Sequence, residues 1–144
     1  MTLNIKFNTE ERNKVLIAQN FYPSLYHKLD YFIDEQLVAQ SRELLYEYLI
    51  NFRKAIDSLK KEDSTSLHSI GGVVDIEITR GTQKFLQIKI ISEKIINKKI
   101  KEEIFETKIS YEELKKSYSR LLLEIKEIAS EINLNLNFNE LDEV

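Results

Sequence analysis

Alternating apolar and polar residues at the start of the chain predict a β-strand over residues 3–8, because this period of two is typical of a half-buried strand. The apolar positions are Leu3, Ile5 and Phe7. A short helix is expected next, over residues 10–19. Thr9 would cap it, since Glu10 and Glu11 follow as an acidic first turn that favours the helix dipole.

Residues 25–34 fit a strand and a helix about equally well. Their apolar positions alternate, but they also recur at helical spacings. We favour a strand that ends in a turn at 34–36. The alternative is one helix from 24 to 61, which is long for a compact domain. Pro23 is the only proline and disfavours helix at Tyr22, so it marks a boundary.

Residues 41–61 show the clearest helical stripe in the first half of the chain, with Ser41 as the expected N-cap. The stripe consists of Leu44, Leu45, Tyr48, Leu49, Phe52, Ile56 and Leu59. Residues 60–68 are polar and are expected to form a linker.

Clean alternation returns at residues 73–79 and 85–91, and these segments are expected to form a β-hairpin with its turn at 80–83. The polar positions, which would lie on the outer face, include Asp75, Glu77, Gln87 and Lys89. A third strand is expected over 99–107. The turn before it is less clearly defined, because two adjacent isoleucines at 95 and 96 are too apolar for a free loop.

The strongest local signal lies at Ser110, where a capping box and a hydrophobic staple begin a helix that runs to about residue 132. The Ser110 hydroxyl can accept from the Glu113 amide, and the Glu113 carboxylate can accept from the Ser110 amide. Residues 134–139 alternate like a strand. The acidic residues 140–144 are expected to fray.

These elements predict an α+β fold in which an antiparallel β-meander is covered on one face by two long amphipathic helices. A length of 144 residues suits a single domain. Both helices carry one apolar stripe and the strands are apolar at alternate positions only. The other face of the meander should therefore be largely polar.

Composition excludes several classes of protein. The net charge is −3 and the pI is near 5.5, without the basic excess typical of nucleic-acid binders, so no nucleic-acid partner is expected. The chain has no cysteine, which excludes disulfides and thiolate chemistry. Apolar runs are too short to span a membrane, and the first residues lack a signal-peptide layout. We expect a cytoplasmic protein.

Candidate catalytic chemistry is sparse. The two histidines, His27 and His68, are far apart in sequence and belong to no metal-binding motif. The three glycines match neither the G-x-x-x-x-G-K-[ST] loop that binds nucleotide phosphates nor the G-x-G-x-x-G motif of dinucleotide-binding folds. The pair Glu112-Glu113 is explained by helix capping. We therefore expect no enzyme activity, no cofactor and no bound metal.

A protein partner is the more promising expectation. Aromatic residues cluster between 21 and 32, where tyrosines serve either core packing or an interface. The candidate binding residues are those of this cluster and of the outer hairpin face: Tyr22, Tyr26, Tyr31, Asp75, Glu77, Gln87 and Lys89.

The hairpin followed by a helix entry at 109–115, which reads Ile-Ser-Tyr-Glu-Glu-Leu-Lys, resembles small α+β immunity proteins of bacterial polymorphic-toxin and contact-dependent inhibition systems. The resemblance covers most of the chain as a layout. It implies a cytoplasmic, non-enzymatic protein that binds and neutralises one cognate toxin domain. The alternatives are a small homodimeric, structural or regulatory interaction protein, for example from a phage, and a small carboxylate-dependent hydrolase.

Overall fold

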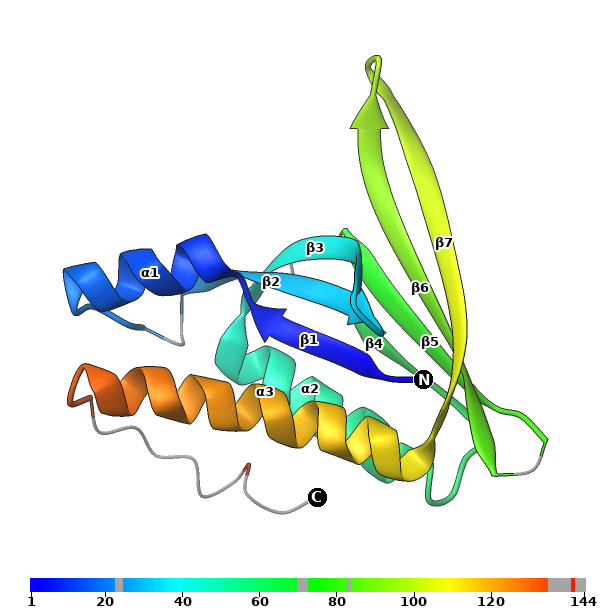
Figure 1. Ribbon diagram of the computed structural model, residues 1–144. Coiled ribbons are helices and arrows are strands. Elements are labelled where there is room, and N and C mark those ends of the chain that lie inside the picture. Colours follow the sequence, from blue (N-terminus) through cyan, green and yellow to red (C-terminus); the bar gives the residue numbers. More distant parts are fainter. Residues whose placement is uncertain (23–24, 70–72, 83, 135–140, 142–144) are drawn as a thin grey trace.

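The computed structural model describes residues 1–22, 25–69, 73–82, 84–134 and 141. The fold is α+β, with two antiparallel sheets and three helices in this part of the chain (Figure 1). The elements in chain order are β1 (Leu3–Phe7), α1 (Thr9–Ala18), β2 (Tyr26–Ile33), β3 (Gln36–Leu44), α2 (Leu45–Ser58), β4 (Ser64–His68), β5 (Val74–Arg80), β6 (Phe85–Ile96), β7 (Lys99–Ser110) and α3 (Tyr111–Glu131).

Sheet A contains β1, β2 and β3 in that order. The strand interpretation of residues 25–34 is confirmed by β2, and the expected strand at 3–8 is confirmed by β1. The prediction of a helix from residue 41 was wrong at its start, because residues up to Leu44 belong to β3 and α2 begins at Leu45. Ser41 is therefore a buried strand residue rather than an N-cap.

Sheet B contains β4, β5, β6 and β7 in that order. The expected hairpin is confirmed by β5 and β6 and the expected third strand by β7, but they belong to one of two sheets, so the expected fold around a single meander is not confirmed. The prediction of a polar linker at 60–68 was wrong, because Ser64–His68 pairs with β5 as a fourth strand. The proposed turn at 80–83 includes Gln83, which lies outside the described residues.

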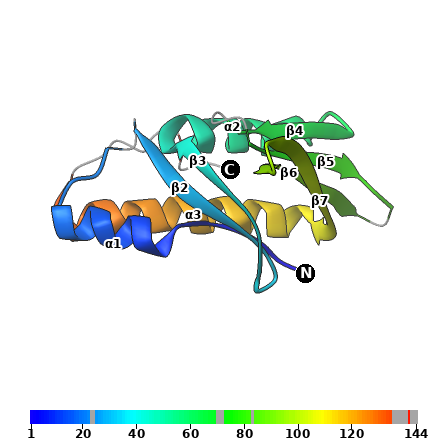
Figure 2. The ribbon, with the colours of Figure 1, turned by 90° about the horizontal axis from the view of Figure 1, so that it is seen from above.

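The helices do not simply cover one face of a single meander. Helix α2 packs against β4 and α3, and α3 packs along β1 of the other sheet. Seen from above, α3 runs from α1 at one end of the molecule to β7 at the other (Figure 2). The two sheets share one core with α2 and α3. The expected arrangement of two helices on one meander therefore lacked the second sheet that the structure contains.

Two of the three helix starts are explained by caps. The Ser110 hydroxyl accepts from the Glu113 amide at 3.0 Å, which confirms the predicted start of α3. The Glu113 carboxylate pairs with Arg120 instead of completing the capping box. Helix α1 is capped by Asn8, whose side chain accepts from the Glu11 amide at 3.1 Å, rather than by Thr9.

The end of the chain contributes to the core. Leu141 is fully buried, and its carbonyl accepts from the Tyr118 hydroxyl at 2.6 Å. The expectation of a frayed tail at 140–144 was therefore wrong at Leu141. The expected strand at 134–139 lies, except for residue 134, outside the described residues.

Strands β6 and β7 continue beyond the rest of sheet B as a two-stranded ribbon, which we call the arm (residues 93–104). The register between β5 and β6 ends at Val74 and Ser92, and one further backbone hydrogen bond joins the Glu93 amide to the Val73 carbonyl. From Lys94 on, β6 pairs only with β7. The ribbon stands away from the body (Figure 1). Asn97 and Lys98, with φ of 52° and 62°, form its two-residue turn, and such positive φ values are typical of a type I′ hairpin.

Candidate protein-binding surface

The outer face of sheet B brings the charged and polar hairpin residues together, as the alternation predicts. The register places Glu77 opposite Lys89 and Asp75 opposite Ile91, with Gln87 on the same face. We define the outer face by three rows across the sheet: Asp75, Ile91 and Ile104; Glu77, Lys89 and Glu106; Thr79, Gln87 and Lys108. Opposite charges face each other across the strands of the middle row, which stabilises the sheet modestly.

The outer face continues onto the arm as a series of isoleucines, a feature that the sequence analysis did not assign to a site. Cross-strand pairs form between Ile91 and Ile104 and between Ile95 and Ile100. Ile104, Ile100 and Ile95 are 50%, 71% and 78% exposed. The sequence signal for this surface was the apolar character of residues 95 and 96, which did not fit a loop and now lie in β6.

The three candidate tyrosines do not form one surface. Tyr22 and Tyr26 are about half exposed, at 53% and 51%, whereas Tyr31 is fully buried. The Tyr31 hydroxyl donates to the Tyr48 hydroxyl at 3.0 Å and lies 2.7 Å from the Ser41 hydroxyl. Burial raises the pKa of Tyr31 far above its ordinary value. Tyr31 is therefore a core residue, and its prediction as a partner-binding residue was wrong.

Both histidines have partners within the fold. His27 is buried between the rings of Phe7 and Phe21. Its Nδ1 lies 3.2 Å from a Glu11 carboxylate oxygen, and its Nε2 lies 2.9 Å from the Tyr22 carbonyl oxygen. His68 is exposed at the edge of sheet B, with its Nδ1 3.1 Å from an Asp75 carboxylate oxygen. These contacts give each ring a structural role.

Among the described carboxyl groups, that of Glu124 has a clearly shifted pKa. Burial raises the pKa of Glu124, and a hydrogen bond from the Phe7 amide and the nearby Arg12 guanidinium oppose that shift only in part. The group lies where α3 meets the edge of sheet A, away from the outer face of sheet B. Its contacts join secondary-structure elements, which is a structural task.

The described residues hold no group of three or more histidine, aspartate or glutamate side chains arranged to bind a metal ion. A shallow hollow on the outer side of sheet A is lined by Thr2, Asn4, Lys6, Phe32, Asp34 and Glu35. A second hollow lies between the β2–β3 turn and the base of the arm, where Asp34, Glu35 and Glu106 contribute its acidic groups. Among the described helices, none is both long and apolar enough to cross a membrane.

Comparisons with known proteins identify no family. No family model and no curated protein matches the chain. One solved structure with a similar arrangement is titled "Crystal structures of trypanosoma bruciei MRP1/MRP2". It shares 13% identity and covers 87% of this chain and 83% of its own, with a TM-score of 0.43. A similarity at that level supports no statement about function.

Proposed function

We propose that this chain is a non-enzymatic protein-binding module that acts by occupying a surface of another protein. The observation that carries the proposal is the outer face of sheet B. It presents charged residues of both signs next to paired, exposed isoleucines on an open sheet. Protein interfaces combine such apolar centres with polar surroundings.

The shape of the surface favours a protein over a small ligand. Small-molecule sites are concave and bury most of the ligand. The outer face is one side of a sheet whose central side chains, Asp75, Gln87 and Lys89, are half-buried, while Glu77 is exposed. Exposed apolar groups beside charges are typical of surfaces that meet another macromolecule.

The specific form that we propose is neutralisation of a bacterial toxin domain, following the sequence resemblance. In that role Asp75 and Glu77 would approach basic groups of the toxin and speed the encounter. Such steering acts on the association rate and weakens as salt is added.

The first test is whether a gene for a toxin domain lies next to the gene for this chain, which the proposal expects. The chain is then co-expressed with that toxin domain, and survival of the host cells is scored. Binding of the two purified proteins is then measured at low and high salt. The proposal expects protection and a complex whose association slows with salt. Toxicity that the chain leaves unchanged, together with absence of a complex, would exclude the toxin-neutralising role.

A double variant locates the binding face. Asp75→Asn with Glu77→Gln removes two charges and keeps side-chain size, so association should slow while the fold is retained. The matched control is Glu35→Gln with Glu127→Gln, which removes two exposed charges elsewhere. Equal association rates for both double variants would move the binding site away from the outer face.

A further inference from the structure

The arm lacks the support that a two-stranded ribbon normally needs. An isolated hairpin is at best marginally stable in water, and a third strand or a packed face is usually required. The arm nevertheless exposes isoleucines at 95 and 100 near its tip. In the described part of the chain, β7 pairs only with β6, so its other edge presents unpaired backbone groups. Such an edge is a template for another strand.

Charges inside the arm are poorly matched across its two strands. Lys94 lies opposite Lys101, and Glu93 lies opposite Glu102. Like charges in opposed positions destabilise a sheet. Lys94 instead reaches diagonally to Glu103, with 3.1 Å between the ammonium and a carboxylate oxygen. Lys101 therefore lies opposite Lys94, and the neighbouring Glu103 is already paired with that same Lys94.

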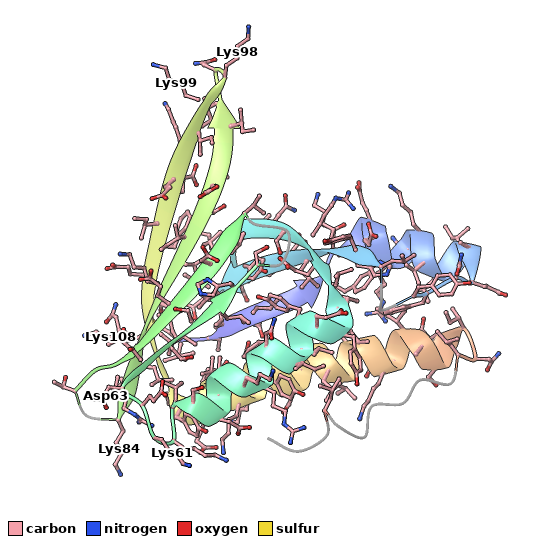
Figure 3. All side chains as sticks on the ribbon, turned by 180° about the vertical axis from the view of Figure 1, so that it is seen from behind. Lys61, Asp63, Lys84, Lys98, Lys99 and Lys108 are labelled. Carbon is pink, nitrogen blue, oxygen red and sulfur yellow. The ribbon has the colours of Figure 1, made fainter. Side chains whose placement is uncertain are left out.

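Charge is segregated along the open edge of the arm, from its tip to Glu106. The lysines lie toward the tip, and the glutamates lie toward the base of the arm. The tip lysines Lys98 and Lys99 project away from the body (Figure 3). The charged residues from the tip through β7 are Lys98, Lys99, Lys101, Glu102, Glu103, Glu106 and Lys108, of which Lys108 lies beyond the arm in the body of sheet B. An arm with lysines at its tip and glutamates near its base is complementary to a second copy of itself that runs in the opposite direction.

We propose that two copies of this chain associate through antiparallel pairing of their β7 strands, with the two-fold axis at Glu102. In this register Lys101 lies opposite Glu103 of the second copy, and Ile100 lies opposite its Ile104. Each pairing occurs twice, because a two-fold interface is isologous. The isoleucine pairs of the two arms then form continuous rows across four strands.

The base of the arm offers a place for the tip of the second copy. The same register brings Lys98 and Lys99 of one copy to Glu106 and Phe105 of the other. These two residues line the hollow that also contains Asp34 and Glu35. In this register the basic tip of one arm therefore meets three carboxylates at the base of the other, which adds a second complementary contact to the strand pairing.

Neighbouring registers lose these matches. Moving the two-fold axis by one residue toward the tip places Lys101 opposite itself and Ile100 opposite Glu102. Moving it by one residue toward the base places Glu103 opposite itself and Glu102 opposite Ile104. The proposed register has one unfavourable pair, Glu102 opposite its own copy, against the doubled Lys–Glu and Ile–Ile pairs.

Charge-reversal variants of the full chain test the register. Lys101→Glu alone and Glu103→Lys alone each turn two attractive pairs into repulsive ones, so each should weaken self-association about 10- to 100-fold. An equimolar mixture of the two variants should form a heterodimer, because both pairs between positions 101 and 103 again join opposite charges. Sedimentation equilibrium measures the affinities, and a size tag on one variant identifies the heterodimer by native mass spectrometry.

Two further variants sharpen the outcome. Glu102→Gln removes the repulsion at the axis and should tighten the dimer, whereas Lys54→Glu, an exposed reversal on α2, should leave it unchanged. If the lysines served only to block pairing at the edge, Lys101→Thr should associate more tightly than the wild type. The proposal instead expects this variant to associate more weakly. A wild-type chain that stays monomeric up to its solubility limit, or a variant mixture that stays monomeric, would overturn the proposal.

Discussion

Glu124 is the sharpest test of how the two sheets and α3 are joined. Strand β1 is the outer strand of sheet A, so one row of its backbone groups has no neighbouring strand. Side chains of α3 satisfy two of them. The Phe7 amide donates to Glu124 Oε1 at 2.6 Å, and the Leu3 carbonyl accepts from the Arg120 guanidinium at 3.2 Å.

Two substitutions separate the hydrogen bond from the charge. Glu124→Met removes the acceptor and leaves the Phe7 amide unpaired, which costs about 1–3 kcal/mol. Loss of the ion pair with Arg12, at 3.4 Å, adds at most about 1 kcal/mol because the pair is partly exposed. Glu124→Gln keeps an oxygen for the amide and removes the buried charge, so its net effect should stay within about 1 kcal/mol.

The pH dependence follows from the direction of the shift. The pKa of Glu124 is raised in the folded state above the ordinary 4.5, so the folded protein holds this proton more tightly than the unfolded chain does. The resulting contribution to stability is complete below the unfolded pKa and is lost as pH rises through the folded pKa. Glu124→Gln has no such loss, so its stability relative to wild type should improve as pH rises above about 4.5.

Urea unfolding at several pH values measures both effects. With an m-value of about 2 kcal/mol per molar, the Met variant should lower the midpoint by about 1 M and the Gln variant by less than about 0.5 M. Glu62→Gln, at an exposed position outside α3, is the control. A Gln variant as unstable as the Met variant, with the same difference from wild type at every pH, would refute the reasoning.

Three further predictions concern the core, the helix start and ligands. Ser110→Ala should lower the free energy of unfolding by about 0.5–2 kcal/mol, as measured by denaturation, because the Glu113 amide loses its acceptor. Tyr31→Phe should cost about 1–3 kcal/mol in the same assay, since the Ser41 and Tyr48 hydroxyls each lose a buried partner. Zinc or ATP at low concentration should leave the melting temperature unchanged; a rise of several degrees would contradict the proposed absence of cofactor binding.

Strands with large apolar side chains on one face were predictable from the sequence. In β5 the buried positions are Val74, Ile76 and Ile78, so the alternation is plain. Strand β3 was missed because its buried residues are Val38, Ala39, Ser41 and Glu43, of which only Val38 is a large apolar side chain. Strand β4 was not predicted for a similar reason, since Leu67 is its only fully buried side chain. Pairing with a neighbouring strand, rather than local pattern, defines both.

The candidate site was predictable where it depended on alternation and not where it depended on tertiary packing. The same face for Asp75, Glu77, Gln87 and Lys89 follows from strand geometry alone. Tyr31 also shares a face of β2 with Leu29, so alternation indicated a buried position that its assignment to a binding surface ignored, whereas the burial of Asp30 beside it does not follow from the pattern. Asp30 is stabilised there by the side chains of Asn8 and Gln40, which come from segments distant in sequence.

The isoleucines at 95 and 96 were too apolar for the loop expected from the sequence, and the structure of the arm shows why. A solvated turn gains nothing from apolar residues, and the structure resolves the local conflict by extending β6 to Ile96. It does so without covering the side chains: Ile95 is 78% exposed within the described chain. Consistency between local sequence and global fold is the usual property of natural proteins. An apolar segment that forms a regular strand and still faces water is therefore best explained by a surface outside the monomer. The lysines at the tip of the arm and the glutamates near its base favour a second copy of the same arm as that surface.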